Sequence, residues 1–265
     1  MVSVSNGQNG FSHQHSSAAN PGTDIVIVSY NSLRHLQRCL QALYRYTPRP
    51  FKIYIVDNAS TDGTVSFLQG RADVECIFNT VNKGFAAACN QGIRRGHHDY
   101  IVLLNPDVEV TKGWLEPLIR VARNPKVAVV GPKMVNPAGL IVGAGVQSWE
   151  EITRPRGWLQ PDRPGLYDRL EECISVGGAC YLLKRALLAE LGLLDERYFL
   201  YFEETDYSIS ALKAGYKVIY NPESKVIHHV AGSGAGEDFN RRMMHFQESQ
   251  RQFVRKWRGK IPCLP

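Results

Sequence analysis

The sequence contains no apolar run that approaches the ~18 residues a helix needs to cross a bilayer. It has no CxxC pair, and its six cysteines are scattered, which argues against a structural zinc site and favours reduced thiols. Residues 1–22 have no charged stretch followed by an apolar one, so we expect no export signal there. They are rich in Ser, Asn and Gly and are predicted to form a disordered arm. These absences indicate a cytoplasmic globular protein.

The composition is that of a chain able to bury a sizeable core, with 265 residues of which 44% are hydrophobic. The net charge of +6 suits anionic partners such as nucleotides, acidic lipids or nucleic acid, but selects none of them. No internal repeat or second domain boundary is evident. We therefore assign residues 23–240 to one domain and residues 241–265 to a basic C-terminal helix or tail.

Short apolar runs alternate with stretches of helical periodicity from Thr23 onward. The first four apolar runs are DIVIV, FKIYIV, VECIF and YIVLL, and segments with helical spacing lie between them. This order predicts an α/β fold with a mostly parallel central sheet flanked by helices. Ligands of such sheets bind beyond the carboxyl ends of the strands, where the polar clusters of this sequence fall. Residues 136–172, rich in Pro, Gly, Trp and Arg, are predicted to form a long loop.

Polar residues follow the second and third predicted strands. Asp57 ends the second strand, where a carboxylate is suited to accept hydrogen bonds from a base or a sugar, whereas Asp62 is expected to cap the next helix. Asn82-Lys83-Gly84 precedes a helix of small residues. Its backbone N–H groups and Lys83 can face a phosphate, although a capped, closely packed helix explains the same pattern.

Two further clusters carry carboxylates. In LLNPDVEV, after the fourth predicted strand, Asp107 can ligate Mg²⁺ or Mn²⁺ together with a diphosphate, or can simply lie exposed in a turn. In YFEETDYS, three carboxylates open a helix: Glu203, Glu204 and Asp206. They are either ordinary charges at a helix N-terminus or a crowded group that contains a general base. His228 and His229 end the last predicted strand and face opposite sides, so one of them can bind a metal.

Taken in order, these stretches resemble a family 2 glycosyltransferase of the GT-A fold, in the rhamnosyltransferase-like branch that builds bacterial surface polysaccharides. The resemblance runs from about Asp24 to His229 and rests on seven motifs in sequence: VSYN, VDNASTDGT, NKGFAAACNQGI, LLNPDVEV, SVGGACYLLKR, LGLLDERYFLYFEETDYSISALKAGYK and HHVAGS. Each motif is weak alone, but the shared order is specific. It implies a Rossmann-like sheet that binds a nucleotide-diphosphate sugar.

The resemblance also implies a role for each matching residue. The nucleotide-binding residues are Ser29, Tyr30, Asn31, Asp57, Asn82, Lys83, Gly84 and Asn105. Asp107 is the implied chief ligand of Mg²⁺ or Mn²⁺, and the spacing to Ser233 favours His228 over His229 as a second ligand. Gly177 and Gly178 are expected near the donor sugar and the acceptor.

The catalytic base departs from the family pattern. The family usually places an aspartate second in a Glu-Asp pair, whereas this chain has Glu203-Glu204 followed by Asp206. We prefer Glu204, which occupies the position of the base but is one methylene longer, and Asp206 stays open as the alternative. The resemblance implies inversion at the anomeric carbon by direct displacement.

The predicted function is transfer of a sugar from a dTDP- or UDP-linked donor, with rhamnose as one candidate, to a saccharide or lipid-linked acceptor. Two other functions stay open. A sugar nucleotidyltransferase would need an N-terminal Gly-rich phosphate loop, which DIVIVSYNSLRHL lacks. A non-catalytic module that binds nucleotide or glycan is suggested by the unusual Asn105 and Glu204.

The basic tail is a separate feature, with seven Arg or Lys residues opposed within the segment only by Glu248. One interpretation is a solvated helix packed on the domain by Phe253 and Trp257. The other is peripheral contact with anionic lipid at the inner face of the plasma membrane. No nucleic-acid partner is expected, because the aromatic residues form no recognised stacking motif.

Overall fold

The computed structural model describes residues 22–148, 150–152, 156–230 and 239–261. Apart from Gly22, the predicted disordered arm therefore lies outside the described residues. The strands are β1 (Thr23–Ser29), β2 (Phe51–Asp57), β3 (Glu75–Phe78), β4 (Tyr100–Leu104), β5 (Val108–Val110), β6 (Val127–Val135), β7 (Ile141–Gly143), β8 (Glu171–Glu172), β9 (Cys180–Lys184) and β10 (Lys217–His228). The helices are α1 (Leu33–Tyr46), α2 (Thr64–Gln69), α3 (Phe85–Arg95), α4 (Leu115–Ala122), α5 (Leu188–Leu191), α6 (Glu203–Lys213) and α7 (Phe239–Trp257).

One sheet runs through the molecule in the order β3-β2-β1-β4-β9-β6-β10-β5, with β7 beside β6 and β8 beside β10. The block β3-β2-β1-β4 is parallel, and so is the pair β6 and β10. Strand β9 lies between them and is antiparallel to both β4 and β6. The predicted α/β fold is confirmed. Because β9 is antiparallel to β4, the carboxyl end of β4 and the start of β9 lie at the same edge of the sheet.

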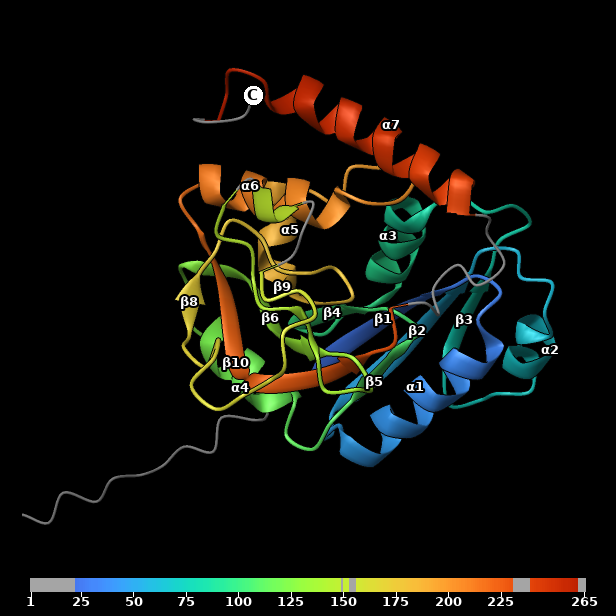
Figure 1. Cartoon of the computed structure of the whole chain (residues 1–265). Helices are drawn as coiled ribbons and strands as arrows, with labels where there is room; N and C mark the ends of the chain where they lie inside the picture. Colours follow the sequence, from blue (N-terminus) through green and yellow to red (C-terminus); the bar gives the residue numbers. More distant parts are fainter. Residues whose placement is uncertain (1–21, 149, 153–155, 231–238, 262–265) are drawn as a thin grey trace, which may run out of the picture.

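Helices cover both faces of this sheet, with α1 and α4 on one side and α3, α5 and α6 on the other (Figure 1). Strand β1 shows why: Ile25 and Ile27 pack in the cluster that contains α1 and α4. Val26 and Val28 point the other way and pack with α3 and α6. A strand buried on both faces needs apolar residues at every position, which explains the continuous run seen in the sequence.

The predicted loop over residues 136–172 is not wholly irregular. It contributes β7 and β8 to the sheet, although strands of two and three residues are too short to show alternation in a sequence. Lys133 of β6 anchors this segment. Its buried Nζ lies 2.8 Å from Oδ1 of Asp162 and 2.5 Å from Oδ1 of Asp168. Because the ammonium is paired with two carboxylates, its burial is compensated.

The C-terminal helix α7 lies across the top of α6 and α3 in Figure 1. It begins at Phe239, two residues before the predicted boundary, and its Phe253 and Trp257 are buried against Tyr198 and Phe202. This contact agrees with the packed-helix interpretation of the tail. Within the described part of the chain, none of the helices combines the length and apolarity needed to span a membrane.

Candidate active site

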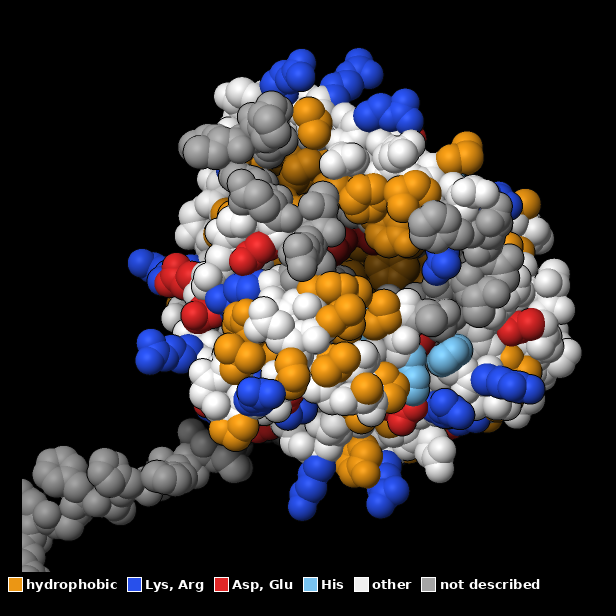
Figure 2. Space-filling view, viewed as in Figure 1, with side chains coloured by type: hydrophobic (Ala, Val, Ile, Leu, Met, Phe, Trp, Pro, Cys, Tyr) orange, Lys and Arg blue, Asp and Glu red, His pale blue; other side chains and the backbone are white. Residues whose placement is uncertain are grey.

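A cavity of about 340 Å³ opens beyond the carboxyl ends of β1 and β4. Figure 2 shows it as a hollow bordered by hydrophobic side chains. Nine of the predicted site residues line it: Tyr30, Asn82, Gly84, Asn105, Gly177, Gly178, Glu203, Glu204 and His228. They come from six separate segments of the chain. The fold therefore gathers at one edge of the sheet most of the residues chosen from the sequence.

Six predicted site residues do not line the cavity, and two of these, Ser29 and Asn31, make hydrogen bonds in the turn beside it. Oγ of Ser29 pairs with Oγ of Ser32 at 2.9 Å, below the turn that carries Tyr30. Oδ1 of Asn31 accepts a hydrogen bond from the backbone N–H of Thr61 at 2.7 Å. The other four are Asp57, Lys83, Asp107 and Asp206. Lys83 is exposed, and the remaining three are buried.

Asp57 is fully buried at the end of β2. Its Oδ1 accepts a hydrogen bond from the backbone N–H of Ser60 at 2.9 Å. Its Oδ2 is also buried and, among the described residues, has no hydrogen-bond partner. A buried carboxylate oxygen without a donor is costly, so a ligand N–H such as that of a nucleobase would satisfy it. By contrast, Asp62 caps helices, because its carboxylate accepts from the N–H groups of Leu33 and Thr64.

Asp57→Asn is expected to weaken nucleotide binding about 10-fold, because an amide N–H₂ replaces one of the two acceptor oxygens. Calorimetric titration with UDP and dTDP measures the change in Kd. Asp62→Asn is the matched control. It weakens two helix caps and lowers the melting temperature, but it should leave both Kd values unchanged. An unchanged Kd in Asp57→Asn would show that Oδ2 does not contact the nucleotide.

Asn58 is a cavity residue whose role the sequence did not reveal. Its Nδ2 donates to the backbone oxygen of Gly84 at 3.1 Å, and its Oδ1 accepts from Nδ2 of Asn79 at 2.9 Å. It therefore ties the loop before α3 to the end of β2. Gly84 has φ of +83°, and an added Cβ would lie 2.5 Å from the backbone oxygen of Phe199. Only glycine fits this close approach.

The predicted metal ligands lie on two adjacent antiparallel strand ends. Asp107 precedes β5 and His228 ends β10, where Val108 and His228 are paired. Nε2 of His228 lies 3.4 Å from Oδ1 of Asp107, and the Asp107 carboxylate is buried. Nε2 of His228 makes no hydrogen bond within the part of the chain that the structure describes. One nitrogen and one oxygen donor facing each other suit a divalent cation of the Mg²⁺ or Mn²⁺ type.

His229 is occupied elsewhere, since its Nε2 lies 2.7 Å from Oε1 of Glu109 and its backbone N–H donates to the oxygen of Asp107. His35 of α1 was not predicted, but its ring lies 5.5 Å from that of His229, and burial lowers the pKa of His35. In the described ranges, no group of three or more His, Cys, Asp or Glu side chains is arranged to hold a metal. A cation beside Asp107 and His228 would therefore need further ligands from a substrate.

The three carboxylates at the start of α6 separate into two environments. Glu203 and Glu204 line the cavity, whereas Asp206 is buried and accepts hydrogen bonds from Tyr198 and Trp257. Burial, followed by repulsion from Glu204, holds the pKa of Glu203 well above its usual range. Burial also raises the pKa of Glu204. Gly178 makes room for this side chain, since an added Cβ there would lie 3.1 Å from Cδ of Glu204.

Glu203→Gln is expected to stabilise the protein at alkaline pH. Because its pKa is raised in the folded state, Glu203 contributes most stability below the unfolded pKa and loses it as the pH rises through the folded pKa. Glutamine keeps the shape without the ionisation. We expect the melting temperature to rise by roughly 3 °C at about pH 8 and hardly at about pH 5, as measured by calorimetry. An equal change at both pH values would contradict a raised pKa of Glu203.

The remaining wall of the cavity is apolar, and the residues that form it were not predicted. It is made of Met134, Val142, Trp158, Phe199, Leu200 and Tyr201. The aromatic run YFLYF before Glu203 was visible in the sequence and is the signal that could have indicated this wall. An apolar wall beside two carboxylates excludes water and explains why their charged forms are disfavoured.

The model of the family described as glycosyl transferase family 2 matches residues 24–191. The N-acetylglucosaminyl-diphospho-decaprenol L-rhamnosyltransferase of Mycobacterium tuberculosis is 30% identical over 234 residues, covering 79% of this chain and 76% of that protein. The low-salt glycan biosynthesis hexosyltransferase Agl10 of Haloferax volcanii is 25% identical over 71% of this chain and 60% of its own length. The predicted rhamnosyltransferase-like resemblance is confirmed.

Solved structures share the fold. GalNAc-T7 with UDP, GalNAc and Mn²⁺ has a TM-score of 0.65 at 19% identity, covering 80% of this chain and 44% of that one. The mannosyltransferase PcManGT of Pyrobaculum calidifontis, in complex with GDP-Man and Mn²⁺, has a TM-score of 0.63 at 19% identity, covering 90% of this chain and 65% of that one. The predicted GT-A fold is confirmed. Together with the family match over residues 24–191, these findings show that the chain belongs to glycosyl transferase family 2.

Proposed function

We propose that this protein is an inverting, metal-dependent transferase that moves a sugar from a nucleotide-diphosphate donor to a hydroxyl of a saccharide or lipid-linked acceptor. One observation carries the proposal. The same cavity is lined by Glu204 on one wall and by His228, the partner of Asp107, on another. The relative from Mycobacterium tuberculosis, named as a rhamnosyltransferase that acts on a diphospho-decaprenol, supports a surface-polysaccharide role with dTDP-rhamnose among the candidate donors.

In this reaction Glu204 accepts the proton of the acceptor hydroxyl. The acceptor oxygen forms a bond to the anomeric carbon as the bond from that carbon to the diphosphate breaks, which inverts the configuration. Burial raises the pKa of Glu204, so the carboxylate is a stronger base than a solvated one. Burial and repulsion from Glu204 hold the pKa of Glu203 well above its usual range, so a second negative charge beside Glu204 is disfavoured.

Asp107 and His228 would hold Mg²⁺ or Mn²⁺. Their fit to a cation rests on the facing donor atoms, 3.4 Å apart, and on the otherwise unbonded Nε2 of His228 in the described structure. Such a cation supplies positive charge that stabilises the departing nucleoside diphosphate. The carboxylate of Asp57 orients the donor by accepting a hydrogen bond from the base. Asn82 and Gly84, which belong to the loop before α3, line the same cavity.

Incubation of the protein with UDP- and dTDP-sugars, Mn²⁺ and a panel of saccharide and lipid-linked acceptors tests the proposal. We expect release of nucleoside diphosphate and an acceptor extended by one sugar of inverted configuration. Pyrophosphate as the product would indicate a sugar nucleotidyltransferase instead. Nucleotide binding without turnover across the panel would indicate a non-catalytic module.

We also propose that α7 brings the protein to anionic lipid. Its outward face exposes Arg251, Arg255 and Arg258, which border a shallow groove, and blue side chains crowd this edge in Figure 2. Lys256 is not part of this surface, which corrects the expectation for the tail. Its ammonium turns inward and pairs with Asp195 and with the buried carboxylate of Asp206.

Replacing Arg251, Arg255 and Arg258 together by Gln is expected to weaken binding to anionic vesicles about 100-fold, at ~1 kcal/mol for each arginine near the surface. Flotation with phosphatidylserine vesicles and with neutral vesicles measures it. Glutamine at Arg34, Arg38 and Arg45 removes the same charge from exposed positions of α1, on the opposite side of the molecule. Equal recovery of both triple variants, or of the unaltered chain with both vesicle types, would contradict the lipid contact.

A further inference from the structure

Helix α7 packs on the short segment of residues 198–202 that leads into α6 and forms part of the cavity wall. Oγ of Ser249 donates to the backbone oxygen of Leu200 at 2.8 Å. The ring of Phe253 lies 5.1 Å from that of Phe202. A helix at the end of the chain therefore holds the backbone of an active-site wall.

That segment has an unusual backbone just before the carboxylate pair. Tyr201 and Phe202 have φ of +73° and +72°, a left-handed conformation that costs free energy in residues with a side chain. From the other side, the N–H of Phe85 donates to the oxygen of Phe199 at 2.6 Å. Two successive residues in this conformation persist only where neighbouring elements fix them, and α7 is one of those elements.

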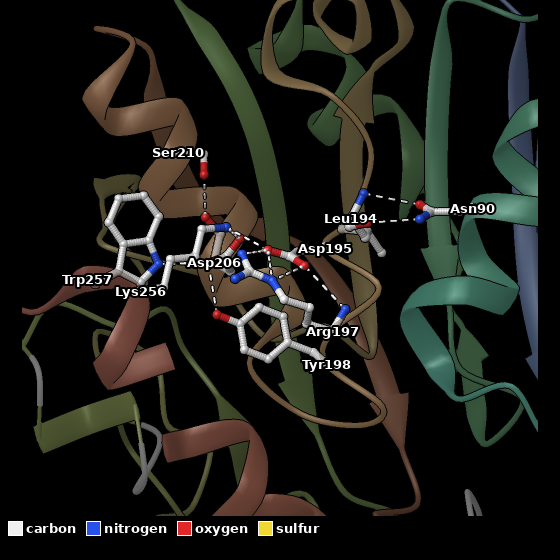
Figure 3. A network of polar contacts seen from close by, with 9 residues as sticks. All are labelled: Asn90, Leu194, Asp195, Arg197, Tyr198, Asp206, Ser210, Lys256 and Trp257. Carbon is white, nitrogen blue, oxygen red and sulfur yellow. Dashed lines mark hydrogen bonds and ion pairs between the residues drawn. The ribbon is translucent and has the colours of Figure 1, made fainter. Parts of the chain in front are cut away.

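Asp206 connects α7 to the first turn of α6 (Figure 3). Its Oδ1 accepts from the hydroxyl of Tyr198 at 3.0 Å and from Nε1 of Trp257 at 2.7 Å. Its Oδ2 lies 2.6 Å from Nζ of Lys256, which also bridges to Oδ2 of Asp195 at 2.9 Å. The carboxylate is only 3% exposed and does not line the cavity. It is therefore occupied by three donors and is not placed to take a proton from an acceptor.

The backbone of Glu204 is held from the opposite side by β9. The hydroxyl of Tyr181 donates to the backbone oxygen of Glu204 at 3.1 Å and pairs with Oγ of Ser208 at 2.8 Å. The first turn of α6 thus lies between a contact from the sheet and a contact from α7. Glu204 is two residues from Asp206, so a shift of Asp206 would move the turn that carries Glu204.

We propose that Asp206 is a positioning residue: through Lys256 and Trp257 it fixes the first turn of α6 so that Glu204 faces the acceptor. This inference rests on the proposed role of Glu204 as the base. The proposal gives α7 a role in sugar transfer, in addition to the lipid contact proposed above. It also resolves the choice between Glu204 and Asp206, because the two carboxylates have separate tasks on one turn.

Asp206→Asn and Lys256→Met in the full chain test the inference. We expect kcat to fall 10- to 100-fold at a temperature where both variants are folded, with the Kd for UDP and the KM for the donor within about twofold of the unaltered values. The double variant Asp206→Asn with Lys256→Gln restores a neutral hydrogen-bonding pair. We expect it to recover part of the kcat that Lys256→Met loses, because it leaves no unpaired carboxylate in the interior.

Arg185→Met is the matched control. It breaks another buried ion pair, in which Arg185 lies 2.8 Å from Oδ2 of the fully buried Asp24, at the end of β1 away from the cavity. We expect it to lower the melting temperature and to keep kcat. A kcat that stays unchanged in folded Asp206→Asn, or that falls equally in Arg185→Met, would overturn the positioning role. If the unaltered chain shows no transfer at all, the proposed function has failed instead.

Discussion

Asp107→Ala is expected to lower kcat/KM for sugar transfer by about 1000-fold or more, since a cation that stabilises a leaving diphosphate contributes several kcal/mol. Asp107 is the carboxylate that faces Nε2 of His228 at 3.4 Å, and the described residues offer no larger cluster of metal ligands. Loss of this side chain leaves His228 alone. Steady-state rates of nucleoside diphosphate release, measured across a range of Mn²⁺ concentrations, give the effect.

Substitutions at two residues near Asp107 in the sequence serve as controls for that result. Asn105→Ala is expected to cost about 10-fold, because it removes one polar amide from the cavity lining. Glu109→Ala removes a carboxylate two residues from Asp107 that is paired with His229, and it should preserve the Mn²⁺ dependence. Full activity in Asp107→Ala would show that this strand end is not a metal site.

The location of the site could be predicted because strand ends are readable in a sequence. Asp57, Asn105 and His228 each follow an apolar run, and strands of an α/β sheet bring such positions to one edge. What the pattern could not give was the antiparallel course of β9, because a buried strand has the same apolar run in either direction.

The sequence alone could not show that the carboxylates of Glu204 and Asp206 have different roles. Glu204 and Asp206 lie within one helical turn, and only the direction of each side chain shows that one lines the cavity and the other meets α7. The partners of Asp206 lie about fifty positions away, at Lys256 and Trp257. The pattern suggested that Trp257 packs on the domain, but it did not indicate that either residue meets Asp206. Contacts over such separations depend on packing, which local periodicity does not encode.

Glu204→Gln is expected to lower kcat by 100- to 10,000-fold, the usual contribution of a general base, while the Kd for the nucleotide stays the same. The amide has the shape of the carboxylate but cannot accept the proton. Because burial raises the pKa of Glu204 above the ordinary 4.5, the kcat of the unaltered protein should fall as the pH is lowered through that raised pKa. The pH dependence of kcat, measured with saturating donor, checks both expectations.

Glu204→Asp provides the control, because it introduces the aspartate that the resemblance described above leads us to expect at this position. It keeps a proton acceptor, so its kcat should exceed that of Glu204→Gln at least 10-fold. The kcat of this variant should also still fall at low pH, which is the acidic limb of the pH profile. The shorter side chain should mainly affect how the acceptor hydroxyl is positioned, since Gly178 leaves space beside Cδ of Glu204. If Glu204→Gln and Glu204→Asp lose activity equally and the acidic limb is unchanged, Glu204 orients the acceptor without removing its proton.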